Sequence, residues 1–382
     1  STGVLNMIMM SFISIPLVTV TWLLLGYSIS FSGDAGGGLL GDLEHFGMLG
    51  IGPTTVHGTV PELLFATFQL TFAIITAALI CGAVADRMKF AAWAVFAPVW
   101  MLLVFAPVFK WVYGGWLGVR GSLDFAGGTA IHVNAGIAAL VAVLILGKRK
   151  GWPGEGHPPH SMPLVMIGTG ILWFGWFGFN AGSALSANGV AVQAFMNTFL
   201  AAAAAGLAWA IVERIKDGHF TNLGAASGIV AGLVAITPAC GYVSSMSSIF
   251  IGLAAGMICC FAVHIKFKAG FDDALDVVGV HFVGGLVGSL MIGLFADADY
   301  FGAEHMNGLF YGGGLELLAE QALANGVTIV YSGIVTAVIL LAIKATIGLR
   351  VPEEVEATGL DVAEHAETAY NTGDAFMERA GF

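Results

Sequence analysis

Charged residues are scarce in this chain. They make up 10% of its 382 residues, whereas 57% are hydrophobic, and the mean hydropathy is +0.87. A chain of this composition cannot cover itself with polar surface in water, which excludes an ordinary soluble domain. We therefore expect a lipid bilayer to cover most of its surface.

Basic residues and cysteines are few as well. The chain has 14 Lys and Arg against 25 Asp and Glu, and this net charge of −11 argues against nucleic acid as a partner. The cysteines lie in or beside apolar runs without metal-type spacing, which predicts small buried side chains without a redox role: Cys81, Cys240, Cys259 and Cys260. No nucleophile–base pair or metal-ligand cluster stands out, so we expect neither an enzyme nor a metal or cofactor site.

Glycine, by contrast, is plentiful at 54 residues. Small residues let membrane helices approach closely, so this composition favours an all-α transmembrane bundle over a β-barrel. Crossing a bilayer takes about 20 apolar residues. Ten stretches are long enough, at approximately 4–31, 62–85, 90–113, 126–147, 163–185, 193–213, 222–238, 247–265, 277–296 and 325–347.

The basic residues alternate between the loops that join these stretches. Only Lys110 and Arg120 fall on one side, and the other twelve fall on the opposite side or beyond the last span. The positive-inside rule makes that second side cytoplasmic. We therefore predict a multi-pass protein of the cell membrane with both termini of this chain in the cytoplasm, and with an acidic outer loop at 297–324.

Two histidines lie within long apolar segments, where a polar side chain is costly and usually lines a pathway. Each follows an aspartate by eight residues, in Asp124–His132 and Asp273–His281. Eight residues of helix span about 12 Å, so we expect both imidazoles near the middle of the bilayer. The alternatives are a buried structural histidine and, for each aspartate, a carboxylate that caps a helix. Asp124 could in addition attract cations electrostatically.

The two Asp–His segments lie on the fourth and ninth spans, which cross the membrane in opposite directions. This predicts an inverted repeat of five helices, with the histidines facing each other where the halves meet. The expected divisions are a transmembrane domain 1–347, containing an incomplete first repeat 1–147, a second repeat 163–296 and an extra helix 325–347, and a cytoplasmic tail 348–382. Four spans precede the ninth within its repeat, but only three precede the fourth. We therefore expect ten spans of an eleven-span fold, lacking the first helix, with a natural ten-helix protein as the alternative.

At these residues the sequence resembles the ammonium transporter family (Amt/Mep/Rh), in its Amt branch. The resemblance runs nearly end to end and includes Asp-Phe-Ala-Gly-Gly from Asp124, His132 and Gly147-Lys148-Arg149. Further matching segments lie at 68–72, 176–183, 237–241 and 348–354. The resemblance implies a homotrimer in which each subunit has its own pore and, in many bacteria, a PII signalling protein that docks at the cytoplasmic face.

The resemblance also implies roles for individual side chains. Trp176 and Ser183, with Tyr113 as a weaker candidate, are expected at an outer recruitment site, and Phe72 and Phe179 at a phenyl gate beneath it. Aromatic faces attract a small cation, and a hydroxyl can accept one of its N–H groups. Helix packing is the alternative role for these aromatic residues.

His132 and His281 correspond to the twin histidines of a narrow apolar channel. Potassium and ammonium are similar in size, but only ammonium can leave a proton behind, and an imidazole pair suits proton relay. This predicts an ammonium transporter that deprotonates its substrate and conducts ammonia. An ammonium sensor or an Rh-type gas channel remains the alternative; the short tail argues against the sensor, and Trp176 and Ser183 favour the Amt branch.

Overall fold

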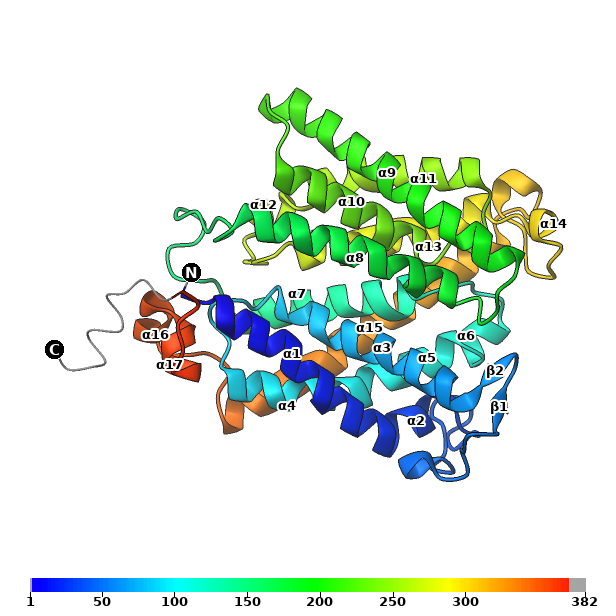
Figure 1. Ribbon diagram of the computed structural model, residues 1–382, viewed down its shortest axis with the longest axis horizontal. Coiled ribbons are helices and arrows are strands. Elements are labelled where there is room, and N and C mark those ends of the chain that lie inside the picture. Colours follow the sequence, from blue (N-terminus) through cyan, green and yellow to red (C-terminus); the bar gives the residue numbers. More distant parts are fainter. Residues whose placement is uncertain (1, 371–382) are drawn as a thin grey trace.

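The computed structural model describes residues 2–370 and is almost entirely helical (Figure 1). Within this range nine helical segments are long and apolar enough to cross a membrane, and α10 is a tenth, shorter apolar helix of 15 residues. These ten segments correspond to the ten predicted spans. The chain is therefore an all-α, multi-pass membrane protein.

Four membrane segments form the first half. They are α1 (Val4–Thr21) with η1 (Trp22–Gly26) and α2 (Tyr27–Phe31); α3 (Glu62–Cys81); α4 (Phe90–Trp100) with η3 (Met101–Phe105), α5 (Ala106–Val112) and α6 (Trp116–Val119); and η4 (Gly128–Val133) with α7 (Asn134–Leu146). The elements η1, η3 and η4 are π-helical turns. Pro98 precedes η3 by three residues and removes a backbone donor, which accounts for the irregular turn there.

Six membrane segments form the remainder. They are α8 (Met162–Gly182), α9 (Gly189–Asp217), α10 (Asn222–Ile236), α11 (Ser245–Ala262) with α12 (Ile265–Ala269), the π-helical η5 (Val278–Phe282) with α13 (Val283–Phe295), and α15 (Glu316–Thr346). The short elements are η2 (Phe46–Met48), η6 (Leu309–Tyr311), β1 (Val56–His57), β2 (Val60–Pro61), α14 (Ala298–Phe301), α16 (Glu353–Thr358) and α17 (Leu360–His365). β1 and β2 form an antiparallel hairpin.

The start of the last membrane helix differs most from its predicted boundary. The extra helix α15 begins at Glu316, nine residues before the expected start at 325, because its first turns are polar. Arg120 neutralises Glu320 there, with the guanidinium 2.8 Å from the carboxylate. Helix η4 begins at Gly128 and η5 at Val278, so His132 and His281 are only the fifth and fourth residues of their helices.

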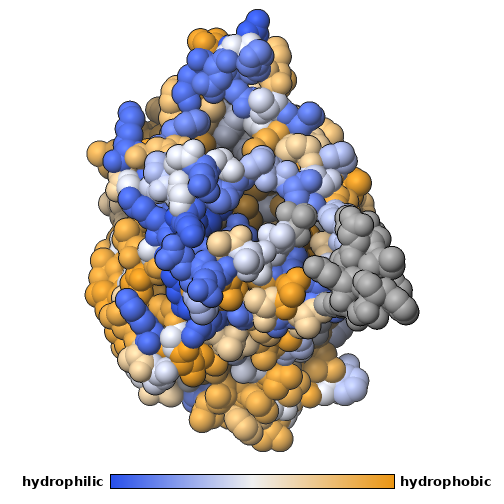
Figure 2. All heavy atoms as spheres, turned by 90° about the vertical axis from the view of Figure 1, so that its left-hand side faces the viewer, coloured by the Kyte–Doolittle hydropathy of each residue, from blue (hydrophilic) through white to orange (hydrophobic). Residues whose placement is uncertain are grey.

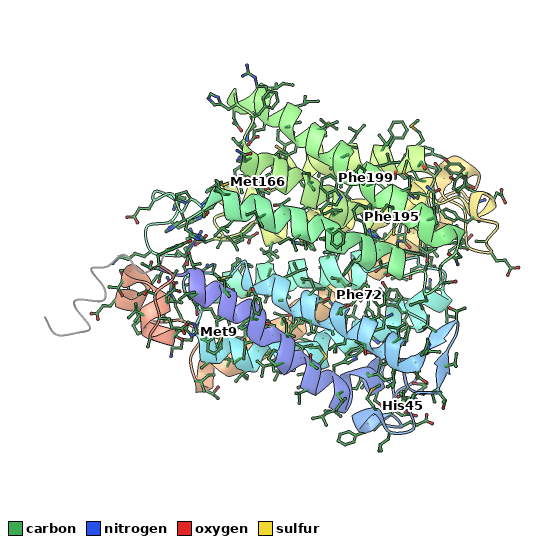
Figure 3. All side chains as sticks on the ribbon, in the orientation of Figure 1. Met9, His45, Phe72, Met166, Phe195 and Phe199 are labelled. Atoms are coloured by element: carbon green, nitrogen blue, oxygen red, sulfur yellow. The ribbon has the colours of Figure 1, made fainter. Side chains whose placement is uncertain are left out.

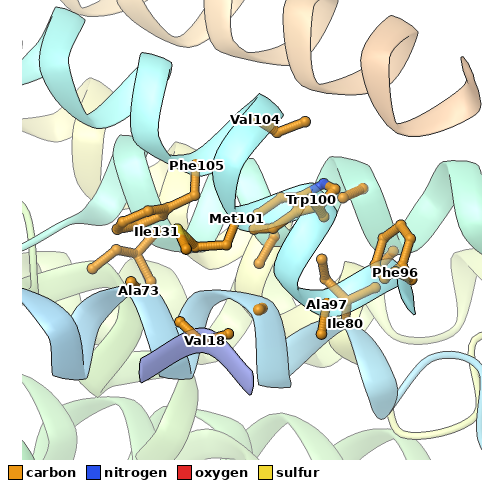
Figure 4. Close-up of a cluster of buried hydrophobic side chains, with 14 of the residues drawn as sticks. Val18, Ala73, Ile80, Phe96, Ala97, Trp100, Met101, Val104, Phe105 and Ile131 are labelled. Carbon is orange, nitrogen blue, oxygen red and sulfur yellow. The ribbon is translucent and has the colours of Figure 1, made fainter. Parts of the chain in front are cut away.

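Close backbone packing joins the helices of the second half. A Cβ atom at Gly252 or Gly256 of α11 would collide with the backbone of Ala201 or Ala205 on α9. These glycines, one helical turn apart, let the two backbones touch, which is how membrane helices gain dispersion contacts without a hydrophobic driving force. In the first half larger side chains fill the interior, and Trp100, Met101, Phe105 and Ile131 of η4 belong to one buried hydrophobic cluster (Figure 4).

The ends of the bundle differ. One, the hairpin end, carries β1, β2 and α6; the other, the terminal end, carries α16, α17 and the start of α1 (Figure 1). At the terminal end Asp361 of α17 accepts a hydrogen bond from the Asn6 backbone N–H at 2.8 Å. Viewed from this end, polar residues gather in the centre and hydrophobic residues around much of the rim (Figure 2). The expected tail 348–382 is described to residue 370, and the rest lies outside the described residues.

An ion-pair cluster at the terminal end joins the two halves of the chain. The Arg149 guanidinium donates to both carboxylate oxygens of Asp272 at 2.9 Å, and Arg87 donates to the carbonyls of Gly147 and Asp272. Asp272 and Arg149 are both buried. Burial opposes ionisation of Asp272, but hydrogen bonds from Arg149 and the charge of Arg87 outweigh it, so its pKa is lowered.

Candidate functional site

A cavity of about 540 Å³ lies at the hairpin end, between α3, α5 and the end of α8. Tyr113, Phe72 and Ser183, three of the residues singled out from the sequence, line it together. The Ser183 hydroxyl donates to the Phe179 carbonyl at 2.8 Å, which leaves its oxygen lone pairs available as acceptors. The cavity therefore offers aromatic faces and several hydroxyl groups, Ser183 among them, to a small cation.

Phe72, which lines this cavity, stacks on the phenyl ring of Phe179. The ring centroids of Phe72 and Phe179 are 4.4 Å apart, and the planes are inclined by 23°. Phe72 is buried on α3, midway along the bundle (Figure 3), and Phe179 belongs to α8. The centroid of Phe179 is 6.2 Å from that of His132. The two rings thus lie between the cavity and the histidines.

The imidazoles of His132 and His281 are in direct contact. Their Nδ1 atoms are 3.0 Å apart, and their ring planes are within 19° of parallel. Both side chains are buried, and His132 Nε2 has no hydrogen-bond partner in the described structure. The alternative of histidines bonded to neighbouring backbone does not describe this pair, because the contact joins two side chains from different halves of the chain.

Trp176 lies with the histidines and does not line the cavity. Its ring stacks on His132 at 5.4 Å with an inclination of 12°, and its Nε1–H donates to the Thr237 hydroxyl at 2.8 Å. Trp176 precedes Ser183 by seven residues on α8, which places it about 10 Å farther along the helix axis. The 176–183 segment therefore contributes to two levels of the bundle.

The aspartates of both Asp–His segments cap the helices that carry the histidines. Asp124 accepts four backbone hydrogen bonds, from Gly127, Gly128, Thr129 and Ala130. Asp273 accepts two, from Val277 and Val278. Both carboxylates are buried, and burial with the nearby charge of Asp276 raises the pKa of Asp273 to about 6. This geometry is that of the capping alternative.

Sequence reasoning missed two neighbours of these residues. Thr237 holds the Trp176 indole, and Lys110 lines the cavity with its ammonium group donating to the Ser32 carbonyl at 3.0 Å. Thr237 belongs to a segment that resembled the family, but no spacing linked it to Trp176, 61 residues earlier. Among residues 2–370 no group of three or more His, Cys, Asp or Glu side chains is placed to hold a metal ion.

A family model described as the Ammonium Transporter Family matches residues 1–370. The chain belongs to the ammonium transporter family. The ammonium transporter of Mycobacterium tuberculosis is 50% identical, over 97% of this chain and 84% of that protein, and the ammonium transporter of Aquifex aeolicus is 49% identical, over 97% and 86%. Relatives of this transporter thus carry transporter names, which agrees with the expectation of a protein other than an enzyme.

Solved structures of the family share the fold of this transporter. The crystal structure of Saccharomyces cerevisiae Mep2 is 37% identical with a TM-score of 0.83, covering 91% of this chain and 82% of that one. A structure described as a sensor Amt protein is 29% identical with a TM-score of 0.87, covering 96% and 91%. The fold therefore occurs both in a Mep2 protein and in a sensor, and the function of this chain has to be argued from its site.

Proposed function

We propose that this protein transports ammonium by binding it in the hairpin-end cavity, deprotonating it and conducting ammonia past His132 and His281. The observation that carries the proposal is the order of the side chains. An aromatic cavity leads to the Phe72–Phe179 stack, and this stack leads to the directly bonded histidines. Each level corresponds to one step: capture, exclusion of water and transfer of a proton.

Capture relies on Tyr113 and Ser183. A phenol ring attracts a cation through its face, and a hydroxyl oxygen accepts one N–H of ammonium. Because Trp176 stacks on His132, we assign it to the histidine level and no longer to recruitment. The cavity is therefore proposed to recruit ammonium with the aromatic face of Tyr113.

Beyond the gate the passage offers imidazole nitrogens as its polar groups. Ammonium gives up one proton, neutral ammonia crosses the apolar section, and the proton moves separately through the shared Nδ1 atoms of the histidine pair. The proton and ammonia recombine at the far end, so one positive charge crosses for each ammonium. Potassium has no proton to give up, and the buried passage does not replace its hydration shell.

The hairpin end is proposed to face outward and the terminal end the cytoplasm. The positive-inside distribution supports this orientation, because Lys110 and Arg120 belong to the hairpin end while Arg87 and Arg149 belong to the terminal end. The resemblance to the family supports a homotrimer and a PII protein docking at the terminal end. Light scattering of the purified protein would measure the number of subunits.

Currents from proteoliposomes on a solid-supported membrane test the proposed function. We expect a current with ammonium, a smaller one with methylammonium and none with potassium. A pH indicator inside the vesicles measures the internal pH in the same experiment. Alkalinisation without charge movement would instead indicate an ammonia channel. Neither a current nor a pH change with ammonium would overturn the transport proposal and favour a sensor. Protein-free vesicles provide the control.

A further inference from the structure

A stripe of polar side chains runs along the buried face of α15. Its members recur every three or four residues and are buried, at Gln321, Asn325, Thr328, Ser332 and Thr336. Polar groups at membrane depth are costly, and they persist where they bond across helices or serve a function. The proposed passage uses none of these side chains.

The outer part of the stripe closes a ring of hydrogen bonds with η4 and α13. Thr129 Oγ1 is 3.0 Å from Ser289 Oγ and 3.1 Å from Asn325 Oδ1, and Asn325 Nδ2 donates to Ser289 Oγ at 2.8 Å. The amide oxygen of Asn325 can only accept, so the Thr129 hydrogen points to it. The hydrogen between the two hydroxyl groups is therefore that of Ser289, which donates to Thr129. Gln321 Nε2 adds donors to the Ser289 carbonyl and hydroxyl, at 3.0 and 3.1 Å.

This ring joins the two segments that carry the histidines. Thr129 precedes His132 by three residues in η4, and Ser289 follows His281 by eight residues along η5 and α13. Between these points the backbones touch, since a Cβ at Gly285 would lie 2.9 Å from the Gly128 carbonyl oxygen and 3.0 Å from His132 Cβ. Small residues allow the contact, and the hydrogen bonds set its register along the helix axes.

The ring has no equivalent in the second repeat. Val278 follows Asp273 by five residues, as Thr129 follows Asp124, and its side chain has no hydroxyl. The anchoring helix α15 also lies outside the repeat. Both histidine segments begin with a π-helical turn, η4 and η5, and α15 hydrogen-bonds through Asn325 to the turn that carries His132.

We propose that Thr129, Ser289, Asn325 and Gln321 are positioning residues that hold His132 at bonding distance from His281. They lie outside the proposed passage and act through the backbone of η4 and α13. The inference rests on the proposed function for its transport readout. Its structural content, the bond between the two Nδ1 atoms, is testable without transport.

The test compares Thr129→Val, which removes the hydroxyl and keeps the shape, with Thr129→Ser, which keeps the hydroxyl. Asn325→Leu removes the ring from the α15 side. Thr336→Val is the matched control, because Thr336 belongs to the same stripe but accepts from Trp100 Nε1 at 2.9 Å, away from η4. Each variant is checked for folding by gel filtration and thermal melting. Its ammonium and potassium currents are then measured in proteoliposomes.

A small displacement of a reacting group from its working geometry can strongly lower its rate of reaction. We therefore expect the ratio of ammonium to potassium current to fall about tenfold in Thr129→Val and Asn325→Leu. Thr129→Ser and Thr336→Val should stay within about twofold of the unsubstituted protein, since the ring survives in both. In imidazole NMR spectra, the chemical shift of the proton shared by the two Nδ1 atoms should change in Thr129→Val and Asn325→Leu only.

The outcomes separate the two proposals. An unsubstituted protein that gives no ammonium current contradicts the transport function. The NMR comparison of the variants then still tests the positioning role. An active protein in which Thr129→Val matches Thr336→Val in selectivity and in the imidazole spectrum overturns the positioning role. Equal losses in all four variants, in proportion to lost folded protein, would also overturn it, because the stripe would then serve stability alone.

Discussion

The Nδ1 atoms of His132 and His281 lie 3.0 Å apart with no other hydrogen-bonding atom between them. One of these nitrogens must carry a hydrogen and the other must accept it, so the two neutral rings are in opposite tautomers. When a proton arrives at Nε2 of the donor ring, the shared proton passes from Nδ1 of that ring to Nδ1 of the other, which then releases a proton from its own Nε2. These three transfers together interchange the two tautomers and carry one proton across the pair. The pair is therefore arranged to pass a proton without moving either backbone.

Replacing either histidine by alanine should abolish selective ammonium transport. His132→Ala and His281→Ala each remove one partner of the shared proton and open the narrow section to water and hydrated ions. Currents with ammonium and with potassium, measured on the same proteoliposomes, check both effects. Normal ammonium current without potassium leak in both variants would contradict the role of the pair.

Tyr113 and Trp176 should affect different kinetic parameters. Tyr113→Ala removes an aromatic face from the cavity, and the loss of a cation–π contact is expected to raise the half-saturating ammonium concentration about three- to tenfold. Trp176→Ala removes the ring stacked on His132 and should mainly lower the maximal current. Concentration series of the initial current distinguish them. A raised half-saturation constant in Trp176→Ala with an unaltered maximum would return Trp176 to the recruitment site.

Deleting residues 349–382 should lower transport without unfolding the protein. The deletion removes Arg350, which donates to the Leu146 carbonyl at 3.2 Å and pairs with Glu356 at 2.6 Å. Leu146 ends α7, the continuation of the segment that carries His132. Transport rate and gel-filtration profile are the measurements, and deletion of 371–382 is the control, since it keeps these contacts. Full activity of the longer deletion would contradict coupling through the tail.

The Arg149–Asp272 pair should make stability depend on pH. Asp272→Asn removes the nearer charged partner of the buried Arg149 guanidinium and leaves the Asp86 carboxylate 3.4 Å away. Breaking a buried pair costs up to about 3–5 kcal/mol. The pKa of Asp272 is lowered in the folded protein, so its contribution is present above the unfolded value near about 4 and is lost as the pH falls through the lowered value.

Melting temperatures of the detergent-solubilised protein and of Asp272→Asn test this, from neutral to acidic pH. The difference in melting temperature between the unsubstituted protein and Asp272→Asn should be large at neutral pH and shrink below about pH 4. The exposed pair Lys150–Glu353 provides a matched control, because screened surface pairs contribute little. A pH-independent difference for Asp272→Asn would show that the packing of the side chain matters and its charge does not.

Much of the architecture could be predicted because its signals are local. Apolar length located the spans, and alternating basic loops gave the topology. Predictions erred where polar residues are helical, as at Glu320 and Gln321 of α15, because their partners are distant in sequence. Glu320 pairs with Arg120, and Gln321 donates to the carbonyls of Leu123 and Ser289. A hydropathy value describes one side chain by itself, whereas the free-energy cost of burying a polar side chain depends on its hydrogen-bonding or charged partner.

The sequence by itself determined the membrane environment, the two Asp–His segments and the family, because composition, spacing and motif are properties of the chain. Only the tertiary structure decided that the imidazoles meet at Nδ1, that Trp176 belongs to their level while Tyr113 and Ser183 line the cavity, and that α15 joins both segments. These are relations of direction and depth between helices. They are set by the packing of side chains far apart along the chain, which the periodicity of one helix does not specify.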